Sequence, residues 1–184
     1  MSERALGFDV SFYQDSDYTP QKIDFQKMRN NGADFAIMRV GQNTWLDPDW
    51  PDYKNDSLVD GLLRGTYWFY DARNYVKSQC DLYWYQIQNA GLDFPAVMDW
   101  ETISVKYVDT DRWSPKFFLS LIKDFIDRMD DHVGRASIFY TNPGWLKYFK
   151  PLPDWLLEHP IWVAYYGPET YLDNGGLLGY PTWQ

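Results

Sequence analysis

The residues that decide the fold are Phe94-Pro95-Ala96-Val97-Met98-Asp99-Trp100-Glu101, an apolar run that ends in two acids. A near-continuous apolar run of this length is typical of a strand buried on both faces of a parallel sheet. Side chains at positions i and i+2 of a strand point to the same face, with Cα atoms roughly 6.5 Å apart. Asp99 and Glu101 can therefore bring two carboxyl groups close together at the end of this strand.

Similar apolar runs recur on both sides of this strand. Five of them predict further strands: Leu6–Ser11, Phe35–Val40, Gly65–Tyr70, Ala136–Thr141 and Ile161–Tyr166. Helix signals separate them: Asp24 to Gly32, Asn74–Ala90, a long helix from Ser114 and Pro115, and short pieces within 47–60 and 143–160. This order predicts an α/β fold with a parallel sheet. Because no Gly-rich phosphate loop follows the first strand, we favour an irregular TIM-like (β/α) barrel over a doubly wound sheet.

Length and charge limit the classes of protein that this chain can represent. Its 184 residues suit a single domain covering 1–184. The net charge of -9 repels phosphate backbones, which argues against nucleic-acid binding and against docking on anionic lipid. No stretch approaches the roughly 20 apolar residues of a membrane span, and we expect no signal peptide, because no apolar segment directly follows Met1. The single cysteine, Cys80, rules out a disulfide framework and predicts a buried thiol.

The acids at the strand ends suggest acid–base chemistry by paired carboxyl groups. Two neighbouring carboxyl groups raise the pKa of one of them, so that a proton donor lies beside an ionised carboxylate. Cleavage of a glycosidic bond needs this pair. A third acid, Asp9, lies in the first predicted strand. The simpler alternative is that each acid caps a helix, forms a turn or pairs with a cation.

Other polar clusters carry weaker signals. Asp47, Asp49 and Asp52 resemble the start of a calcium loop, but the central glycine and terminal glutamate of such a loop are missing. His132 and His159 have no serine or cysteine motif nearby and are expected to be surface or capping groups. We therefore expect neither a metal site nor a cofactor.

Aromatic residues make up 20% of the chain, which exceeds what a core of this size needs. Rings near strand ends are placed to stack on the C–H faces of sugars. These rings are Tyr67, Phe69, Trp100, Tyr140 and Tyr166.

Several motifs in order along the chain resemble those of one family. They are Gly7-Phe8-Asp9-Val10-Ser11 with Gln14, the stretch 32–39 ending in Met38-Arg39, Gly65-Thr66-Tyr67-Trp68-Phe69, Asp99-Trp100-Glu101, Phe139-Tyr140-Thr141-Asn142, Trp162-Val163-Ala164-Tyr165-Tyr166 and Thr182-Trp183-Gln184. Together they resemble glycoside hydrolase family 25, the Chalaropsis-type lysozymes of bacteria, phages and fungi. The resemblance implies an irregular barrel of about five β/α units plus extra strands.

The resemblance also implies a function. It points to a muramidase that cuts the β-1,4 bond between N-acetylmuramic acid and N-acetylglucosamine in peptidoglycan, with retention of configuration. Glu101 corresponds to the general acid/base, Asp99 to a carboxylate that orients the acetamido group or acts as nucleophile, and Asp9 to a third acid. The implied substrate contacts are Arg39, Tyr67, Phe69, Trp100, Tyr140, Tyr166 and Gln184.

Two features depart from this family. The chain stops at Gln184, where family members continue into a last strand, so we expect a truncated barrel with that strand missing. The acidic charge does not draw the chain to anionic cell walls, so a separate wall-binding module is a possible partner. The expected location is extracellular, at the bacterial cell wall, after export or lysis. The alternatives are an inactive barrel that binds cell-wall carbohydrate, and an unrelated α/β hydrolase or interaction barrel.

Overall fold

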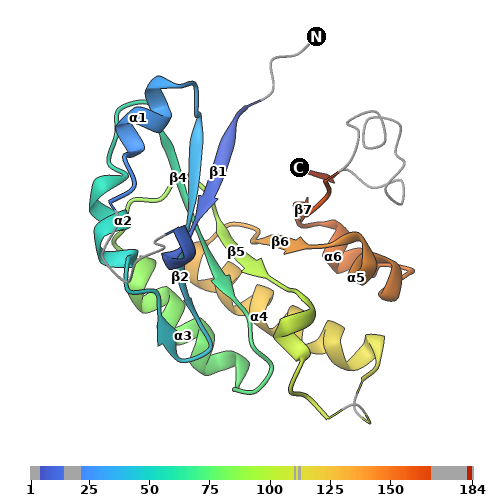
Figure 1. The fold of residues 1–184 in the computed structure, drawn as a ribbon. Coiled ribbons are helices and arrows are strands. Elements are labelled where there is room, and N and C mark those ends of the chain that lie inside the picture. The colour runs from blue at the N-terminus through green and yellow to red at the C-terminus, as the bar shows by residue number, and fades with distance from the viewer. Residues whose placement is uncertain (1–4, 15–21, 110, 112, 167–181, 184) are drawn as a thin grey trace.

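A curled, almost entirely parallel β-sheet forms the centre of the molecule (Figure 1). The computed structural model describes residues 5–14, 22–109, 111, 113–166 and 182–183. The strands follow one another across the sheet as β1 (Gly7–Val10), β2 (Phe35–Gln42), β4 (Leu63–Phe69), β5 (Ala96–Asp99), β6 (Ile138–Thr141), β7 (Ile161–Val163) and β8 (Thr182–Trp183). A short strand, β3 (Trp45–Leu46), pairs antiparallel with β2.

Helices follow most strands and cover the outer face of the sheet, as Figure 1 shows. The α-helices are α1 (Phe25–Asn30), α2 (Trp50–Asp56), α3 (Val76–Ile87), α4 (Pro115–Val133), α5 (Pro143–Tyr148) and α6 (Asp154–Leu157). Two 3-10 helices are η1 (Phe12–Gln14) and η2 (Thr102–Val105). Within the described residues β1 and β8 are not paired with each other, so the sheet is an open half-barrel. The prediction of an irregular (β/α) barrel is confirmed.

Local chemistry explains where the helices begin and end. The Asp24 side chain accepts a hydrogen bond of 2.8 Å from the Lys27 amide and starts α1. The Ser114 hydroxyl accepts one of 3.1 Å from Phe117, and Pro115 occupies the first position of α4. Gly134 ends α4 with φ of 72°, in the left-handed region that glycine adopts readily. The predicted helices at these positions are confirmed.

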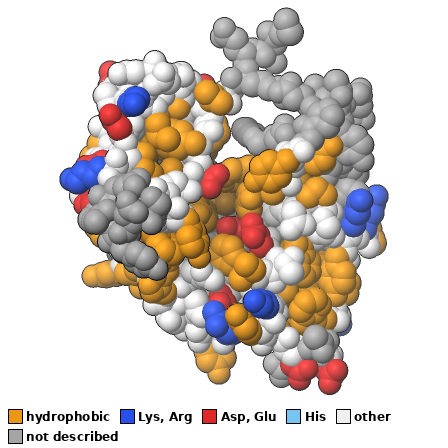
Figure 2. Space-filling view, in the orientation of Figure 1, with side chains coloured by type: hydrophobic (Ala, Val, Ile, Leu, Met, Phe, Trp, Pro, Cys, Tyr) orange, Lys and Arg blue, Asp and Glu red, His pale blue; other side chains and the backbone are white. Residues whose placement is uncertain are grey.

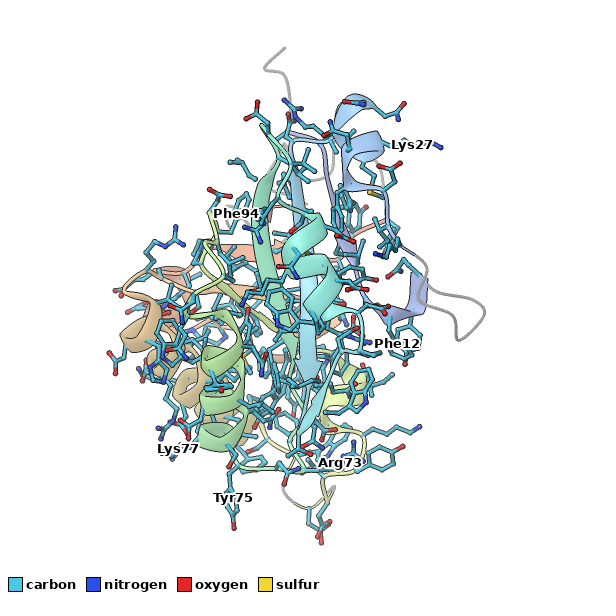
Figure 3. All side chains as sticks on the ribbon, turned by 90° about the vertical axis from the view of Figure 1, so that its left-hand side faces the viewer. Phe12, Lys27, Arg73, Tyr75, Lys77 and Phe94 are labelled. Carbon is cyan, nitrogen blue, oxygen red and sulfur yellow. The ribbon has the colours of Figure 1, made fainter. Side chains whose placement is uncertain are left out.

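The core lies between the sheet and the helices. Side chains fill this space, whereas Lys27, Tyr75 and Lys77 point away from the body of the molecule (Figure 3). Cys80 is buried there as a small hydrophobic group, as predicted. None of the described helices is long and apolar enough to cross a membrane.

All six predicted strands are present, but the sequence prediction missed β3 and β8 as strands. Both contain two residues, which is too short for an alternating pattern to identify a strand.

Candidate active site

A cavity of about 180 Å³ lies at the edge of the sheet where the parallel strands end. It is lined by Asp9, Ser11, Tyr13, Arg39, Tyr67, Phe69, Val97, Asp99, Glu101, Tyr140 and Trp162. Figure 2 shows acidic side chains inside a hollow on this face, with hydrophobic side chains around them. Active sites of β/α barrels lie at the carboxyl ends of their strands, where this cavity opens.

The register of the sheet explains why these residues meet. In one row across the strands, Phe69 pairs with Asp99, Asp99 with Tyr140, and Tyr140 with Trp162. All four line the cavity. A second row, two residues earlier in β4 and β5, contains Arg39, Tyr67 and Val97, which also line it. Residues two apart in a strand point to the same face, so both rows face the cavity.

Asp99 is the most deeply buried acid of the site, with 6% of the residue exposed. Burial raises the pKa of Asp99 well above its ordinary value, and repulsion by Glu101 and Asp9 raises it further. The positive charge of Arg39 opposes this rise. One oxygen, Oδ1, is buried and has no hydrogen-bond partner among the described residues. Asp99 is thus a carboxyl group that is costly to ionise.

Glu101 is half-buried and closer to solvent. Burial raises the pKa of Glu101, and the charge of Asp9 adds to the effect. Its backbone is fixed between β5 and η2, because the Glu101 amide donates to Ser104 Oγ at 3.0 Å and the Ser104 amide donates to the Glu101 carbonyl at 3.0 Å. Such fixing holds the carboxyl group in place at the mouth of the cavity.

Asp9, Tyr67 and Tyr140 complete the polar lining. Asp9 is partly open to solvent, yet the surrounding protein atoms desolvate its carboxyl group and raise its pKa. Burial raises the pKa of Tyr67 and of Tyr140, and the negative charge of Asp99 contributes to both shifts. Both phenols therefore remain hydrogen-bond donors beside the acids.

The structure brings together seven of the ten predicted site residues. They are Asp9, Arg39, Tyr67, Phe69, Asp99, Glu101 and Tyr140. Tyr166 is 99% exposed and does not line the cavity, and Gln184 lies outside the described residues.

Trp100 is not placed to stack on a ligand. It has no exposed surface and packs against the rings of Tyr70 and Phe118, each with a centroid 5.5 Å away. The physical reason is the alternation of a strand, which points Trp100 away from the face that carries Asp99. The prediction that Trp100 contacts a ligand is therefore corrected.

Sequence reasoning missed Ser11, Tyr13 and Trp162, which also line the cavity. Ser11 and Trp162 lie within predicted strands. A two-residue period counted from Asp9 would have found Ser11, and one counted back from Tyr166 would have found Trp162.

The acidic segment near Asp47 has other partners than a metal ion. Asp47 accepts a hydrogen bond of 2.7 Å from Arg39 Nε, and Asp49 accepts one of 3.3 Å from the Tyr53 hydroxyl. Among the described residues, no group of three or more histidine, cysteine or acidic side chains is arranged to hold a metal ion.

A parallel β/α sheet with protonatable carboxyl groups at the carboxyl ends of its strands is the arrangement of a glycoside hydrolase. The chain belongs to the glycosyl hydrolases family 25, whose sequence model matches residues 8–184.

Two curated relatives and one solved structure are similar to this chain. The uncharacterized protein YegX of Escherichia coli (strain K12) is 29% identical over 97% of this chain and 61% of its own length. The N,O-diacetylmuramidase of Arthroderma benhamiae is 27% identical over 76% of this chain and 58% of its own length. This chain thus spans about three fifths of the curated relatives it matches. The solved family 25 glycosyl hydrolase of Bacillus anthracis shares the fold, with a TM-score of 0.77 and 16% identity over 98% of this chain and 76% of the other.

Proposed function

We propose that this chain is a peptidoglycan hydrolase that cuts the β-1,4 bond between N-acetylmuramic acid and N-acetylglucosamine with retention. The observation that carries the proposal is the cavity in which Asp99 and Glu101 lie together, both with a raised pKa. Family membership and the relative named N,O-diacetylmuramidase support the choice of substrate. The reaction would take place outside the producing cell, at a bacterial wall.

Glu101 is the proposed general acid and base. Its raised pKa favours the protonated form that the departing sugar oxygen needs, and its half-buried position leaves the carboxyl group accessible. After the bond breaks, the resulting carboxylate removes a proton from the attacking water.

Asp99 is proposed to assist the substrate. Its carboxylate would accept a hydrogen bond from the N–H of the 2-acetamido group, whose carbonyl oxygen attacks C1. Its deep burial supports this role over direct attack, because a nucleophile needs a clear path to C1. The alternative makes Asp99 a covalent nucleophile, which requires the two carboxyl groups to lie roughly 5–5.5 Å apart. Asp9 is the third acid and raises the pKa of both others by repulsion.

The remaining lining residues would hold the sugars. Phe69 and Trp162 offer rings on which sugar C–H faces can pack, and Tyr67 and Tyr140 offer phenol donors to sugar oxygens. Tyr166 and Gln184 remain proposed substrate contacts, and Arg39 lines the same cavity as the acids.

The test compares the chain with Glu101→Gln on purified peptidoglycan, measuring turbidity loss and the release of muramic-acid reducing ends. We expect activity in the parent and a loss of at least several hundredfold in the variant, because glutamine keeps the shape and removes the proton donor. Glu158→Gln is the matched control, since Glu158 is exposed and does not line the cavity. Equal activity of the parent and Glu101→Gln would reject the role of Glu101.

A barrel that only binds cell-wall carbohydrate is the alternative function. It predicts binding of N-acetylglucosamine oligomers without release of reducing ends. The grouping of three acids with raised pKa values favours the enzyme, because sugar binding alone does not require carboxyl groups that repel one another. A separate wall-binding module stays a proposed partner, because the charge of -9 does not attract the chain to anionic walls.

A further inference from the structure

A buried ion pair lies beside the cavity and has no role in the reaction proposed above. Arg39 Nε donates to Asp47 Oδ2 at 2.7 Å, and the two residues are 3% and 1% exposed. The Phe12 amide donates to the same oxygen at 3.1 Å, and the Asp49 amide donates to Oδ1 at 3.0 Å. Asp47 therefore has a fixed carboxylate, held by two segments of backbone.

Aromatic rings enclose the guanidinium group of Arg39. Its central carbon lies 4.7 Å from the ring centroid of Phe12, 5.1 Å from that of Tyr13 and 5.3 Å from that of Trp45. Phe12, labelled in Figure 3, projects from η1 beside the sheet. These contacts are favourable for a cation and leave it little freedom to move. Asp47 and the rings together determine which way the guanidinium group points.

Arg39 also faces the acids. It lines the cavity with Asp99, and its Nη2 atom is buried without a hydrogen-bond partner among the described residues, as is Asp99 Oδ1. The charged and titratable groups that act on Asp99, or on which Asp99 acts, come from four other strands and from the residues after β5. They are Asp9 on β1, Arg39 on β2, Tyr67 on β4, Glu101 after β5 and Tyr140 on β6. Arg39 is the cation of this set.

We propose that Asp47 is a positioning residue, which acts through Arg39 on the ionisation of Asp99. By binding Nε, the Asp47 carboxylate keeps the guanidinium group turned toward itself and neutralises part of its charge. Asp99 then experiences a weakened positive charge without forming an ion pair, and its carboxylate stays available to the substrate. The role in catalysis rests on the proposed function, whereas the charge coupling does not.

Substitutions of Asp47 and of Arg39 should shift the pKa of Asp99 in opposite directions. Asp47→Asn keeps the shape of the side chain but leaves the charge of Arg39 uncompensated, so the pKa of Asp99 should fall by about one unit. Arg39→Gln removes the cation, so the pKa of Asp99 should rise by a similar amount. A purely structural pair would disturb both variants in the same way and would not move the titration of Asp99 in opposite directions.

The experiment titrates the ¹³C side-chain carboxyl signal of Asp99 in the full chain, assigned by its absence in Asp99→Asn. The double variant Asp47→Asn with Arg39→Gln removes both charges of the ion pair, so neither is left buried and unpaired, and it serves as a control for misfolding. Its Asp99 titration should resemble that of Arg39→Gln. Asp71→Asn is the matched control, because Asp71 is also buried and paired with an arginine, but that arginine, Arg73, does not line the cavity as Arg39 does. It should leave the titration of Asp99 unchanged.

Activity gives the second measurement. The acidic limb of the pH–activity profile should move to lower pH in Asp47→Asn and to higher pH in Arg39→Gln, with kcat affected more than KM. Shifts of Asp99 in the same direction, or no shift in folded variants, would overturn the proposal. Because the titration needs no substrate, opposite shifts in a chain without muramidase activity would support the coupling and reject the proposed function.

Discussion

Replacement of Trp100 by alanine is expected to destabilise the fold, because this ring belongs to the core beneath the active site. Trp100 follows Asp99 directly and has no exposed surface. Its ring stacks on Tyr70 and meets Phe118 and Trp145 edge-on, with centroids 5.5, 5.5 and 5.7 Å away. Loss of the ring leaves a cavity at the point where the chain passes between the two principal acids.

The magnitude follows from the buried area. A tryptophan side chain buries about 150–250 Å², which at about 25 cal/mol per Å² corresponds to about 4–6 kcal/mol. Buried Trp→Ala substitutions commonly cost about 3–5 kcal/mol, and we expect a loss in that range. Trp100→Phe should cost less, because it keeps a ring for Tyr70 and removes Nε1, a buried donor without a partner among the described residues.

Urea unfolding without substrate measures the effect. The alanine variant should lower the urea midpoint by roughly 1–3 M, given typical slopes for a domain of this size. Trp113→Ala is the matched control, because Trp113 also contacts Phe118 but is 38% exposed, and its loss should be smaller. In Trp100→Phe we expect a nearly unchanged KM. A stable alanine variant with a raised KM would refute the reasoning and restore Trp100 as a ligand contact.

Three further predictions concern pH and packing. Asp99→Asn should raise Tm at pH 7 and lose this advantage toward pH 4. Burial raises the pKa of Asp99, so the folded state favours the protonated acid and the ionised acid at pH 7 costs stability, which asparagine avoids. An equal gain in Tm at both pH values would contradict this. His159→Gln should lose more stability at pH 5.5 than at pH 8.5, because the hydrogen bond with Asp130 raises the pKa of His159 in the folded state. The stabilisation by the protonated imidazole is fully present below the ordinary pKa of 6.5 and is lost as the pH rises through the pKa of the folded state. Urea unfolding at both pH values tests this prediction. Gly41→Ala should cost about 1–3 kcal/mol, because an added Cβ would lie 2.5 Å from the Trp45 carbonyl oxygen, and an unchanged urea midpoint would disprove this tight packing.

The parts of the fold that local chemistry determines could be predicted from the sequence. Apolar runs identified the six main strands, and caps such as Asp24 and Ser114 marked the starts of helices. The meeting of Asp9, Asp99 and Glu101 also followed, because parallel strands place their carboxyl ends at one edge of a sheet.

Contacts made by tertiary packing could not be predicted. Arg39 and Asp47 are joined through the β2–β3 hairpin, and β3 is too short to show a pattern. The sequence around Asp47 shows only an incomplete calcium-loop pattern, from which we expect no metal site, and it gives no sign of the pairing with Arg39. Trp100 is a different case. The two-residue alternation of a strand places Asp99 and Glu101 on one face and turns Trp100, which lies between them, to the opposite face. Applied to Trp100, the same alternation would have placed this ring in the core.

The proposed acid–base chemistry depends on an imbalance of charge at the edge of the sheet. Asp9, Asp99 and Glu101 share the cavity with one arginine, Arg39, which is paired with Asp47. Among the lining residues the acids therefore have one cation to stabilise their ionised forms. Burial raises the pKa of all three, and repulsion adds to the effect at Asp99 and Glu101. A second cation in the cavity would favour the ionised form of these groups, and the proposed general acid, Glu101, would then be less able to supply its proton. In the proposed coupling, the buried Asp47 matters to this chemistry because it limits the one cation that opposes the raised pKa of Asp99.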